Sequence, residues 1–214
     1  MISILITDDH PIVRKGIRQL LEDDRKERFA LIDEACNGKE LLEKLKLKNF
    51  DVVLLDISLP GRSGLELLGD IKKLKPATAV VILSIYPEEQ YALRALKLGA
   101  LGYLTKASAP DELIDAVVKA SQGKRYISAS LAEKITFSML EEKEIAISEK
   151  LSVRELEVVS LLASGKTLSG IADELSLSPK TISTYRERIL VKLNLKTTSD
   201  IIRYGIKEGM AEEN

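Results

Sequence analysis

The sequence predicts an α/β fold with a parallel sheet, followed by a smaller, all-helical domain. Two observations support this prediction. Up to about residue 123, short apolar runs alternate five times with amphipathic stretches of helical period, a pattern typical of parallel strands connected by helices. Beyond that point apolar residues recur at helical spacing only, and no further strand is predicted.

The five strand and helix pairs follow one another along the first part of the chain. The predicted strands are ISILIT (2–7), ALIDEA (30–35), VVLLD (52–56), AVVILS (79–84) and GYLT (102–105). The predicted helices cover residues 12–23, 38–47, 64–75, 88–99 and 110–123. Right-handed crossovers leave few topologies for such a chain, and we expect a flavodoxin-like (βα)5 domain over residues 1–123 with strand order 2-1-3-4-5.

The rest of the chain is predicted to form a partly helical linker, residues 124–150, and a helical domain, residues 151–214. In the linker, Ser130 and Glu133 have capping-box spacing before an apolar helical set. In the domain, Ser152 and Glu155 form another such pair, and Ser178 is followed by a proline at the first helical position. Two short helices joined by a tight turn predict a helix-turn-helix.

Composition narrows the class of protein and its location. The chain has 32 Lys and Arg residues against 33 Asp and Glu residues, so its net charge indicates neither nucleic acid nor membrane as a partner. The single cysteine, Cys36, excludes an intramolecular disulfide and fits a reducing compartment. Because no apolar run approaches the ~20 residues of a membrane span, and no secretion signal begins the chain, we expect a soluble, cytoplasmic protein with no membrane contact.

Polar residues follow four of the predicted strands where those strands end. They are Asp8, Asp9, Asp56, Ser84 and Lys106. The carboxyl ends of neighbouring parallel strands meet at one edge of the sheet, and three adjacent carboxylates would repel one another without a cation. Mg²⁺ suits such an all-oxygen site, and an aspartate can accept a phosphoryl group as a nucleophile. The alternatives are a solvated Asp56, a turn-capping Ser84 and a surface Lys106.

Basic residues gather on one predicted helix of the C-terminal domain. Residues 178–196 contain five cations against Glu187, a net charge of 5 − 1 = +4, although residues 126–214 carry 12 basic and 14 acidic side chains. At helical spacing, Ile182, Tyr185, Ile189 and Leu193 form an apolar face, with Lys180, Thr184, Arg188 and Val191 roughly opposite. A basic outer face on the second helix of a helix-turn-helix is suited to the major groove. The alternative is an ordinary solvated face.

The N-terminal motifs ILITDDHPIVRKGI, DVVLLDISLPGRSGLELL, VVILS and GALGYLTK resemble the receiver domain of two-component response regulators. The resemblance implies that Asp56 is the phosphoacceptor, with Lys106 and Ser84 as its catalytic partners. It implies a Mg²⁺ site made by Asp8, Asp9, Asp56 and the backbone carbonyl of Ser58, and a switch made by Ser84 and Tyr103. An ordinary half-exposed strand aromatic is the alternative for Tyr103. Two positions depart from the common pattern, Ile85 and Ala107.

Residues 151–209 resemble the LuxR-type DNA-binding domain, and the whole chain resembles a NarL/FixJ-family response regulator. The resemblance implies that Ser183, Thr184 and Glu187 face bases. It implies that Lys180, Thr181, Arg188 and Lys192 lie nearer the phosphates. Ser169-Gly170 departs from the family pattern, and an internal glycine weakens a helix by ~1 kcal/mol.

We therefore expect a DNA-binding transcriptional regulator controlled by phosphorylation of Asp56 by a sensor histidine kinase. Its partners would be double-stranded promoter DNA and, when phosphorylated, a second copy of the chain. We expect no enzyme activity beyond self-phosphorylation from a phosphodonor and self-dephosphorylation. One alternative is a receiver-containing interaction module acting without phosphorylation or without DNA. Another, a magnesium-dependent phosphohydrolase, would need an acid or base two residues after Asp56, where the chain has Ser58.

Overall fold

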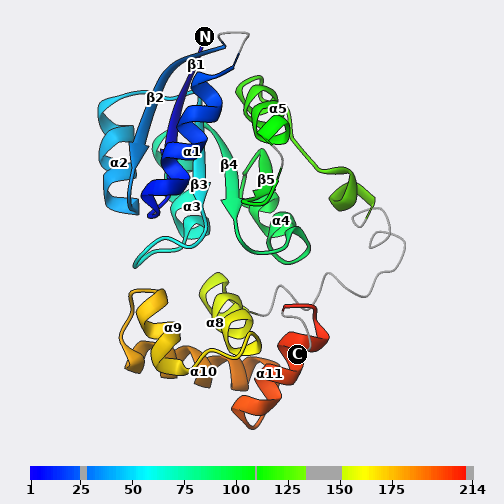
Figure 1. The fold of residues 1–214 in the computed structure, drawn as a ribbon. Coiled ribbons are helices and arrows are strands. Elements are labelled where there is room, and N and C mark those ends of the chain that lie inside the picture. The colour runs from blue at the N-terminus through cyan, green and yellow to red at the C-terminus, as the bar shows by residue number, and fades with distance from the viewer. Residues whose placement is uncertain (25–27, 109, 134–150, 211–214) are drawn as a thin grey trace. The chain divides into compact units, whose positions relative to one another are not determined.

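The computed structural model describes residues 1–24, 28–108, 110–133 and 151–210. The chain divides into two compact units, Met1–Lys134 and Ile135–Asn214 (Figure 1). No helix within the described ranges is long and apolar enough to cross a membrane.

The first unit is built on a parallel five-stranded sheet with strand order β2-β1-β3-β4-β5. Its strands are β1 (Ile2–Thr7), β2 (Phe29–Ala35), β3 (Val52–Asp56), β4 (Ala79–Ser84) and β5 (Gly102–Thr105). Its helices are α1 (Pro11–Glu22), α2 (Gly38–Leu47), α3 (Gly64–Leu74), α4 (Glu88–Lys97) and α5 (Pro110–Ser121). The predicted flavodoxin-like fold and strand order are confirmed.

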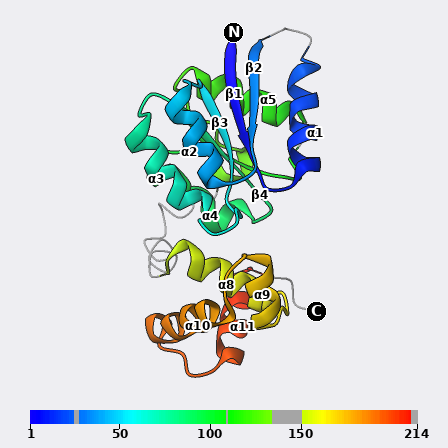
Figure 2. The ribbon, with the colours of Figure 1, turned by 90° about the vertical axis from the view of Figure 1, so that its left-hand side faces the viewer.

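Strand β3 lies at the centre of the sheet, and all five of its residues are buried. It pairs with β1 on one side and β4 on the other, with Leu55 opposite Thr7 and Asp56 opposite Leu83. Helices α1 and α5 pack on one face of the sheet, whereas α2, α3 and α4 cover the other (Figure 2). Helices cover both faces of the sheet, which explains the four consecutive apolar residues of β3, 52–55. Their buried surroundings fix the position of Asp56 at the end of the strand.

The segment after α5 returns to the sheet before its own short helix begins. Tyr126 donates its backbone N–H to the Leu101 carbonyl at 2.7 Å and forms a parallel bridge with Gly102. Residues 129–133 are helical, and the Ser128 hydroxyl accepts from the Leu131 N–H at 3.0 Å. The predicted cap at Ser130 is therefore wrong, because Ser128 caps this helix. Residues 134–150 of the predicted linker lie outside the described residues.

The second unit is helical, as predicted. Its described helices are α8 (Val153–Ala163), α9 (Leu168–Glu174), α10 (Pro179–Leu193) and α11 (Thr198–Lys207). Ser152 and Glu155 form the predicted capping box of α8. The Ser178 hydroxyl accepts from the Thr181 N–H at the start of α10, where Pro179 is the first residue. Helices α9 and α10 and the short turn between them form the helix-turn-helix.

The helix-turn-helix is held together by a small apolar core. Ile182 and Ile189 of α10 are fully buried, as the helical pattern predicted, whereas Tyr185 and Leu193 on the same face are half-buried. Helix α11 approaches α8 closely at Gly205, where a Cβ atom would lie 2.7 Å from the Ala163 Cβ. The packing of α8, α9 and α11 behind α10 leaves the opposite face of α10 exposed.

Candidate functional site

Three carboxylates converge at the carboxyl edge of the receiver sheet. Asp8 and Asp9 directly follow β1, and Asp56 is the last residue of β3. Their ligand atoms, together with a ring nitrogen of His10, all lie within 4.8 Å of one another. Asp8 and Asp56 are at most 1% exposed, whereas the Asp9 side chain is 29% exposed. Two carboxylates of the cluster are therefore buried, and the third lies at its solvent-exposed rim.

Lys106 lies directly against the two buried carboxylates. Its ammonium nitrogen is 2.7 Å from Asp8 Oδ2 and 2.7 Å from Asp56 Oδ2. Burial raises the pKa of Asp56, and the Asp8 charge adds to this, while Lys106 opposes it. Burial alone would lower the pKa of Lys106, but Asp56 and Asp8 outweigh it and raise that pKa above its usual value. A single ammonium thus faces more negative charge than it can neutralise, which favours a second cation.

The chain around Asp56 is shaped by the start of α3. The Ser58 N–H donates to Asp56 Oδ1 at 3.2 Å, and the Gly64 N–H donates to the Ile57 carbonyl at 2.8 Å. A Cβ atom at Gly64 would lie 2.0 Å from the Asp56 carbonyl oxygen. Only glycine permits this approach of α3 to the end of β3.

The predicted switch residues lie on adjacent strands. The Ser84 hydroxyl accepts from the Tyr86 N–H at 3.0 Å, and the Tyr103 hydroxyl donates to the Tyr86 carbonyl at 2.9 Å. Tyr103 is 1% exposed, and burial raises the pKa of its hydroxyl. The alternative of a half-exposed strand aromatic is therefore wrong. The Tyr86 ring stacks on Tyr91 of α4 with centroids 4.9 Å apart, so Tyr86 connects the Ser84 loop to α4.

The structure adds three residues that the sequence did not assign to the site. His10 has its Nδ1 2.8 Å from Asp9 Oδ1, and its N–H donates to Asp8 Oδ1 at 2.8 Å. Arg14 of α1 donates to the Asp8 carbonyl, and Glu34 of β2 accepts from Arg14. Arg14 and Glu34 carry no local signal, since they belong to different elements.

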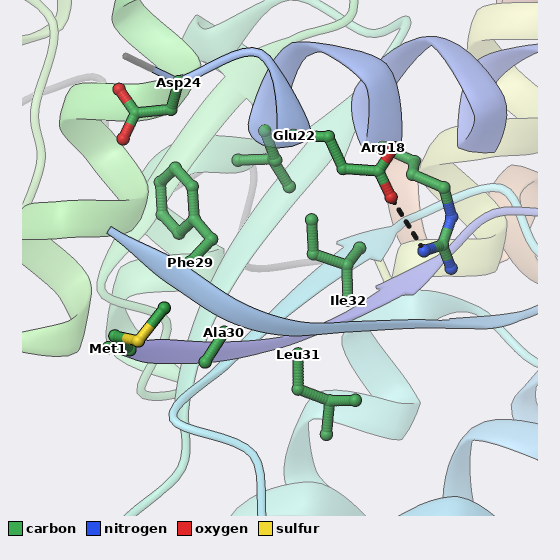
Figure 3. A pocket seen from close by; sticks show the side chains of 9 residues that line it. Met1, Arg18, Glu22, Asp24, Phe29, Ala30, Leu31 and Ile32 are labelled. Atoms are coloured by element: carbon green, nitrogen blue, oxygen red, sulfur yellow. Dashed lines mark hydrogen bonds and ion pairs between the residues drawn. The ribbon is translucent and has the colours of Figure 1, made fainter. Parts of the chain in front are cut away.

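A separate pocket of about 460 Å³ lies between the end of α1 and the start of β2 (Figure 3). It is lined by Met1, Arg18, Leu21, Glu22, Asp24, Phe29, Ala30, Leu31 and Ile32. Arg18 and Glu22 form an ion pair across part of it, at 3.3 Å. None of the predicted site residues lines this pocket.

Most of the predicted DNA contacts lie on the exposed face of α10. Lys180, Thr184, Glu187 and Arg188 are exposed, and Thr181 and Ser183 are half-buried. A shallow hollow of about 390 Å³ on this face is lined by Thr184, Glu187, Arg188, Val191 and Lys192.

Two of the five basic side chains in residues 178–196 contact partners in their own domain. Lys192 lies 2.6 Å from the buried carboxylate of Glu155 at the start of α8. Arg186 donates to the Thr198 hydroxyl at 2.7 Å. Lys180 and Arg188 have no ion pair within the part of the chain that the structure describes. They are therefore the cations of α10 most open to a phosphate backbone.

Family models match two separate parts of the chain. The model of the family "Response regulator receiver domain" matches residues 4–118. The model of "Bacterial regulatory proteins, luxR family" matches residues 149–205.

Relatives match along the whole chain. Response regulator UvrY of Escherichia coli (strain K12) is 34% identical over 211 residues, covering 98% of this chain and 96% of UvrY. Response regulator GacA of Pseudomonas aeruginosa is 32% identical over 213 residues, covering 99% of both chains. The structure of RcsB from Salmonella enterica serovar Typhimurium bound to promoter rprA with the phosphomimetic BeF3− has a TM-score of 0.65 and 29% identity. That match covers 95% of this chain and 97% of RcsB.

The fold, the acidic edge and the helix-turn-helix together define a two-component response regulator with a LuxR-type DNA-binding domain. The chain belongs to the NarL/FixJ family of response regulators. It is a regulator of transcription, and not a classical enzyme.

Proposed function

We propose that Asp56 is the phosphoacceptor of this regulator and that Mg²⁺ is its cofactor. The observation that supports this most directly is the pairing of a buried Asp56 with Lys106, beside the acidic Asp8 and Asp9. A carboxylate that is fixed and surrounded by charge-stabilising groups is suited to phosphoryl transfer, since that reaction depends mainly on positioning and electrostatics.

The residues at the edge fit a magnesium ion. Asp8, Asp9 and Asp56 supply carboxylate oxygens from two strand ends, and the Ser58 backbone carbonyl would complete the protein ligands. Mg²⁺ prefers oxygen ligands, keeps several waters and is commonly held by a few carboxylates with phosphate oxygens. When bound, it would neutralise charge on the transferring phosphoryl group. The exposed rim at Asp9 leaves room for such a group.

The chemical step follows from the geometry of Asp56. The proposed phosphodonor is a phosphohistidine of the sensor kinase. One carboxylate oxygen of Asp56 forms a bond to phosphorus while the bond from phosphorus to the histidine nitrogen breaks, and the leaving imidazole retains the electron pair. Lys106 would then transfer its contact from the Asp56 carboxylate to a phosphoryl oxygen. Ser84 would move its hydroxyl so that the O–H donates a hydrogen bond to another phosphoryl oxygen, and this movement would weaken its present contact with the Tyr86 N–H.

Movement of Ser84 would carry the signal to α4. The Ser84 hydroxyl, the Tyr86 backbone and the Tyr103 hydroxyl form one connected set of hydrogen bonds. A change at Ser84 therefore alters the Tyr86 loop, and through the stacked Tyr91 the position of α4. Such a local charge event can bias a two-state element, here toward a homodimer in which two helix-turn-helix units bind two half-sites.

Two exposed apolar side chains beside the acidic edge support a protein as phosphodonor. Ile12, at the start of α1, is 85% exposed, and Ile85, directly after Ser84, is 62% exposed. Both follow strands whose ends form the acidic edge. Exposed apolar residues around a polar centre are typical of protein interaction sites, and a sensor histidine kinase would present its phosphohistidine there.

For DNA, we propose that Lys180, Thr181, Arg188 and Lys192 contact phosphates and that Ser183, Thr184 and Glu187 face bases. The exposure of this face supports the assignment, and RcsB structures bound to promoter DNA are among the similar solved structures. Lys192 would have to share or leave its contact with Glu155 to reach a phosphate. Glu187 could accept from the cytosine amino group.

The phosphoacceptor is tested by labelling the full-length chain with acetyl phosphate in the presence of Mg²⁺. We expect one phosphoryl group on the wild type, none on Asp56→Ala, and none when Mg²⁺ is chelated. Asp70→Ala is the matched control, since it removes a carboxylate of α3 that pairs with Arg62 away from the cluster. Undiminished labelling of Asp56→Ala would contradict the assignment.

A further inference from the structure

We propose that Arg14 is a positioning residue for the metal site, holding the Asp8–Asp9 peptide in place with the help of Glu34. The inference rests on the proposed function of Asp8 and Asp9 as metal ligands. It concerns two residues, one on α1 and one on β2, that have no part in the chemistry proposed above.

Asp8 is held from four directions. Its N–H donates to the Ala35 carbonyl at 3.2 Å, and its Oδ1 accepts from the His10 N–H at 2.8 Å. Its Oδ2 lies 2.7 Å from Lys106. Its carbonyl oxygen accepts from Arg14 Nη1 at 2.7 Å. Three of these contacts fix the residue itself, whereas the Arg14 contact fixes the peptide group that joins Asp8 to the next residue.

That peptide group decides where Asp9 lies. The Asp9 side chain is 29% exposed, and its Oδ1 contacts the ring of His10, whose side chain is itself 66% exposed. An exposed pair of this kind contributes little fixed geometry. Rotation of the Asp8–Asp9 peptide would carry Asp9 away from Asp8 and Asp56, so the Arg14 contact sets the spacing of the carboxylates that a cation must bridge.

Glu34 holds Arg14 in the orientation that this contact requires. Arg14 Nε lies 3.1 Å from Glu34 Oε2, and the Arg14 side chain is 14% exposed. Burial would raise the pKa of Glu34, but hydrogen bonds from Arg18 and Arg14 outweigh it and lower that pKa. Glu34 is therefore a carboxylate at neutral pH. It neutralises the guanidinium, so that Arg14 supplies geometry at the acidic edge and does not compete with the metal for Asp9.

Supporting contacts of this kind have measurable effects on metal affinity. Removing a group that orients a metal ligand typically costs about 10- to 100-fold in affinity. A guanidinium can donate to two partners in a fixed planar arrangement, whereas an ammonium is a point charge on a flexible stem. We therefore expect Arg14→Lys to hold the Asp8–Asp9 peptide in part, and Arg14→Gln to hold it very little.

The chain offers a matched control in Arg18. It lies on the same helix, and its Nε is 2.6 Å from Glu34 Oε1, so it shares the carboxylate that holds Arg14. Its guanidinium also pairs with Glu22 at the pocket between α1 and β2 (Figure 3). No contact joins Arg18 to Asp8 within the described ranges. Arg18→Gln removes the same charge from α1 and leaves the Asp8–Asp9 peptide held.

The experiment measures metal binding and phosphorylation separately in full-length Arg14→Gln, Arg14→Lys and Arg18→Gln. Mn²⁺ binding is followed by electron paramagnetic resonance without a phosphodonor. The Mg²⁺ dependence of labelling by acetyl phosphate is followed in parallel. For Arg14→Gln, we expect the Mn²⁺ Kd and the half-saturating Mg²⁺ concentration both to rise about 10-fold. The labelling rate at saturating Mg²⁺ should stay within about twofold of the wild type. Arg14→Lys should fall between, and Arg18→Gln should match the wild type.

Two results would overturn the proposal. Equal Mn²⁺ affinities in Arg14→Gln and Arg18→Gln would show that the carbonyl contact has no role. A fall in the labelling rate at saturating Mg²⁺ without a change in Mn²⁺ affinity would make Arg14 part of the reaction instead of a support. Circular dichroism checks folding, and Arg14→Lys keeps the test valid if Arg14→Gln does not fold. Failure of the proposed function itself would appear as a wild type that binds no Mn²⁺ or takes no label.

Discussion

The two candidate sites of this protein are built in opposite ways. The acidic edge collects Asp8, Asp9, Asp56 and Lys106 from the ends of three strands, and its two central carboxylates are at most 1% exposed. The candidate DNA-binding surface comes from a single helix, α10, and Lys180 and Arg188 on it are exposed. The first site depends on long-range packing, whereas the second depends on one helix and its register.

Because of this difference in burial, a charged side chain has a larger desolvation cost at the acidic edge than on α10. Buried carboxylates lose their hydration, and the charge of Asp56 is offset by Lys106 at 2.7 Å. Exposed cations on α10 remain hydrated and need no partner. We therefore expect substitutions at the acidic edge to change folding and reactivity together, and those on α10 to change DNA binding while leaving the fold intact.

The largest effect is expected at Gly64, where packing fixes the acidic edge. In Gly64→Ala the new Cβ would lie 2.0 Å from the Asp56 carbonyl oxygen and 2.9 Å from the Ile57 Cα. Backbone atoms cannot move aside easily, so we expect the free energy of unfolding to fall by about 3 kcal/mol. Hydrogen exchange of the β3 amides measures this change. Gly69→Ala is the control on the same helix, since nothing lies within 4 Å of its Cβ position. Equal protection in the two variants would contradict the packing argument.

The next effect concerns the face of α10. Replacing Lys180 and Arg188 together with alanine should lower the affinity for a mixed-sequence DNA duplex about 100-fold. It should also reduce the salt dependence of binding, the slope of log K against log salt, by about 2. Fluorescence anisotropy over a range of salt concentrations measures both.

A control for this charge loss is available on α11. Arg203→Ala with Lys207→Ala removes the same charge from exposed positions of that helix, and should leave the slope nearly unchanged. If both double variants changed the slope alike, α10 would not be the DNA-binding helix.

A smaller effect tests the cost of burying Asp56. Burial raises its pKa in the folded chain, so the folded state binds this proton more tightly than the unfolded state. The resulting stabilisation is fully present below the unfolded pKa and is lost as pH rises through the folded pKa. At neutral pH without metal, Asp56→Asn should therefore be more stable than the wild type by about 1 kcal/mol.

Thermal unfolding in EDTA, followed from acid to neutral pH, measures this difference. The advantage of Asp56→Asn should shrink as the solution becomes acidic, and it should also shrink when Mg²⁺ is added to the wild type. A variant that is less stable than the wild type at neutral pH in EDTA would show that Lys106 already compensates the charge fully.

The smallest effect is expected at Gly170 in α9. Its N–H donates to the Thr167 hydroxyl at 3.1 Å, and a Cβ would contact that oxygen at 3.4 Å. Gly170→Ala should stabilise α9 by about 0.5 kcal/mol through helix propensity, less than the full value because of this contact. Hydrogen exchange of the Ile171 and Ala172 amides measures the change. Reduced protection of these amides in Gly170→Ala would indicate that the close contact with Thr167 outweighs the gain in helix propensity.

Local signals in the sequence predicted most of the fold. The apolar run that becomes β3 and the caps at Ser152 and Ser178 depend on neighbours a few residues away. The predicted cap at Ser130 was wrong although Ser130 has Glu133 at capping-box spacing, whereas Ser128, which caps the helix, has Leu131 three residues after it. Pairing of Tyr126 with the sheet and a hydrogen bond from Ser128 to Glu88 select Ser128. Contacts with distant residues therefore overrode the stronger local signal.

The sequence by itself determined the order of strands and helices, the strand ends that carry Asp8, Asp56 and Lys106, and the basic face of α10. These follow from periodicity and from the rule that parallel strands end at one edge. Tertiary structure alone decided which side chains are held and which are free. Tyr103 is buried beneath the Tyr86 carbonyl, and Arg14 meets Glu34 from 20 residues away.

The same holds for the cations of α10. Lys180 and Lys192 look equivalent along the helix, yet Glu155, 37 residues away, binds only Lys192 among the described contacts of these two lysines. Such pairings depend on how separate elements pack, and packing brings together residues whose separation in the chain carries no periodic signal. The sequence thus determines which charged groups are present, whereas the folded chain determines which partners they contact.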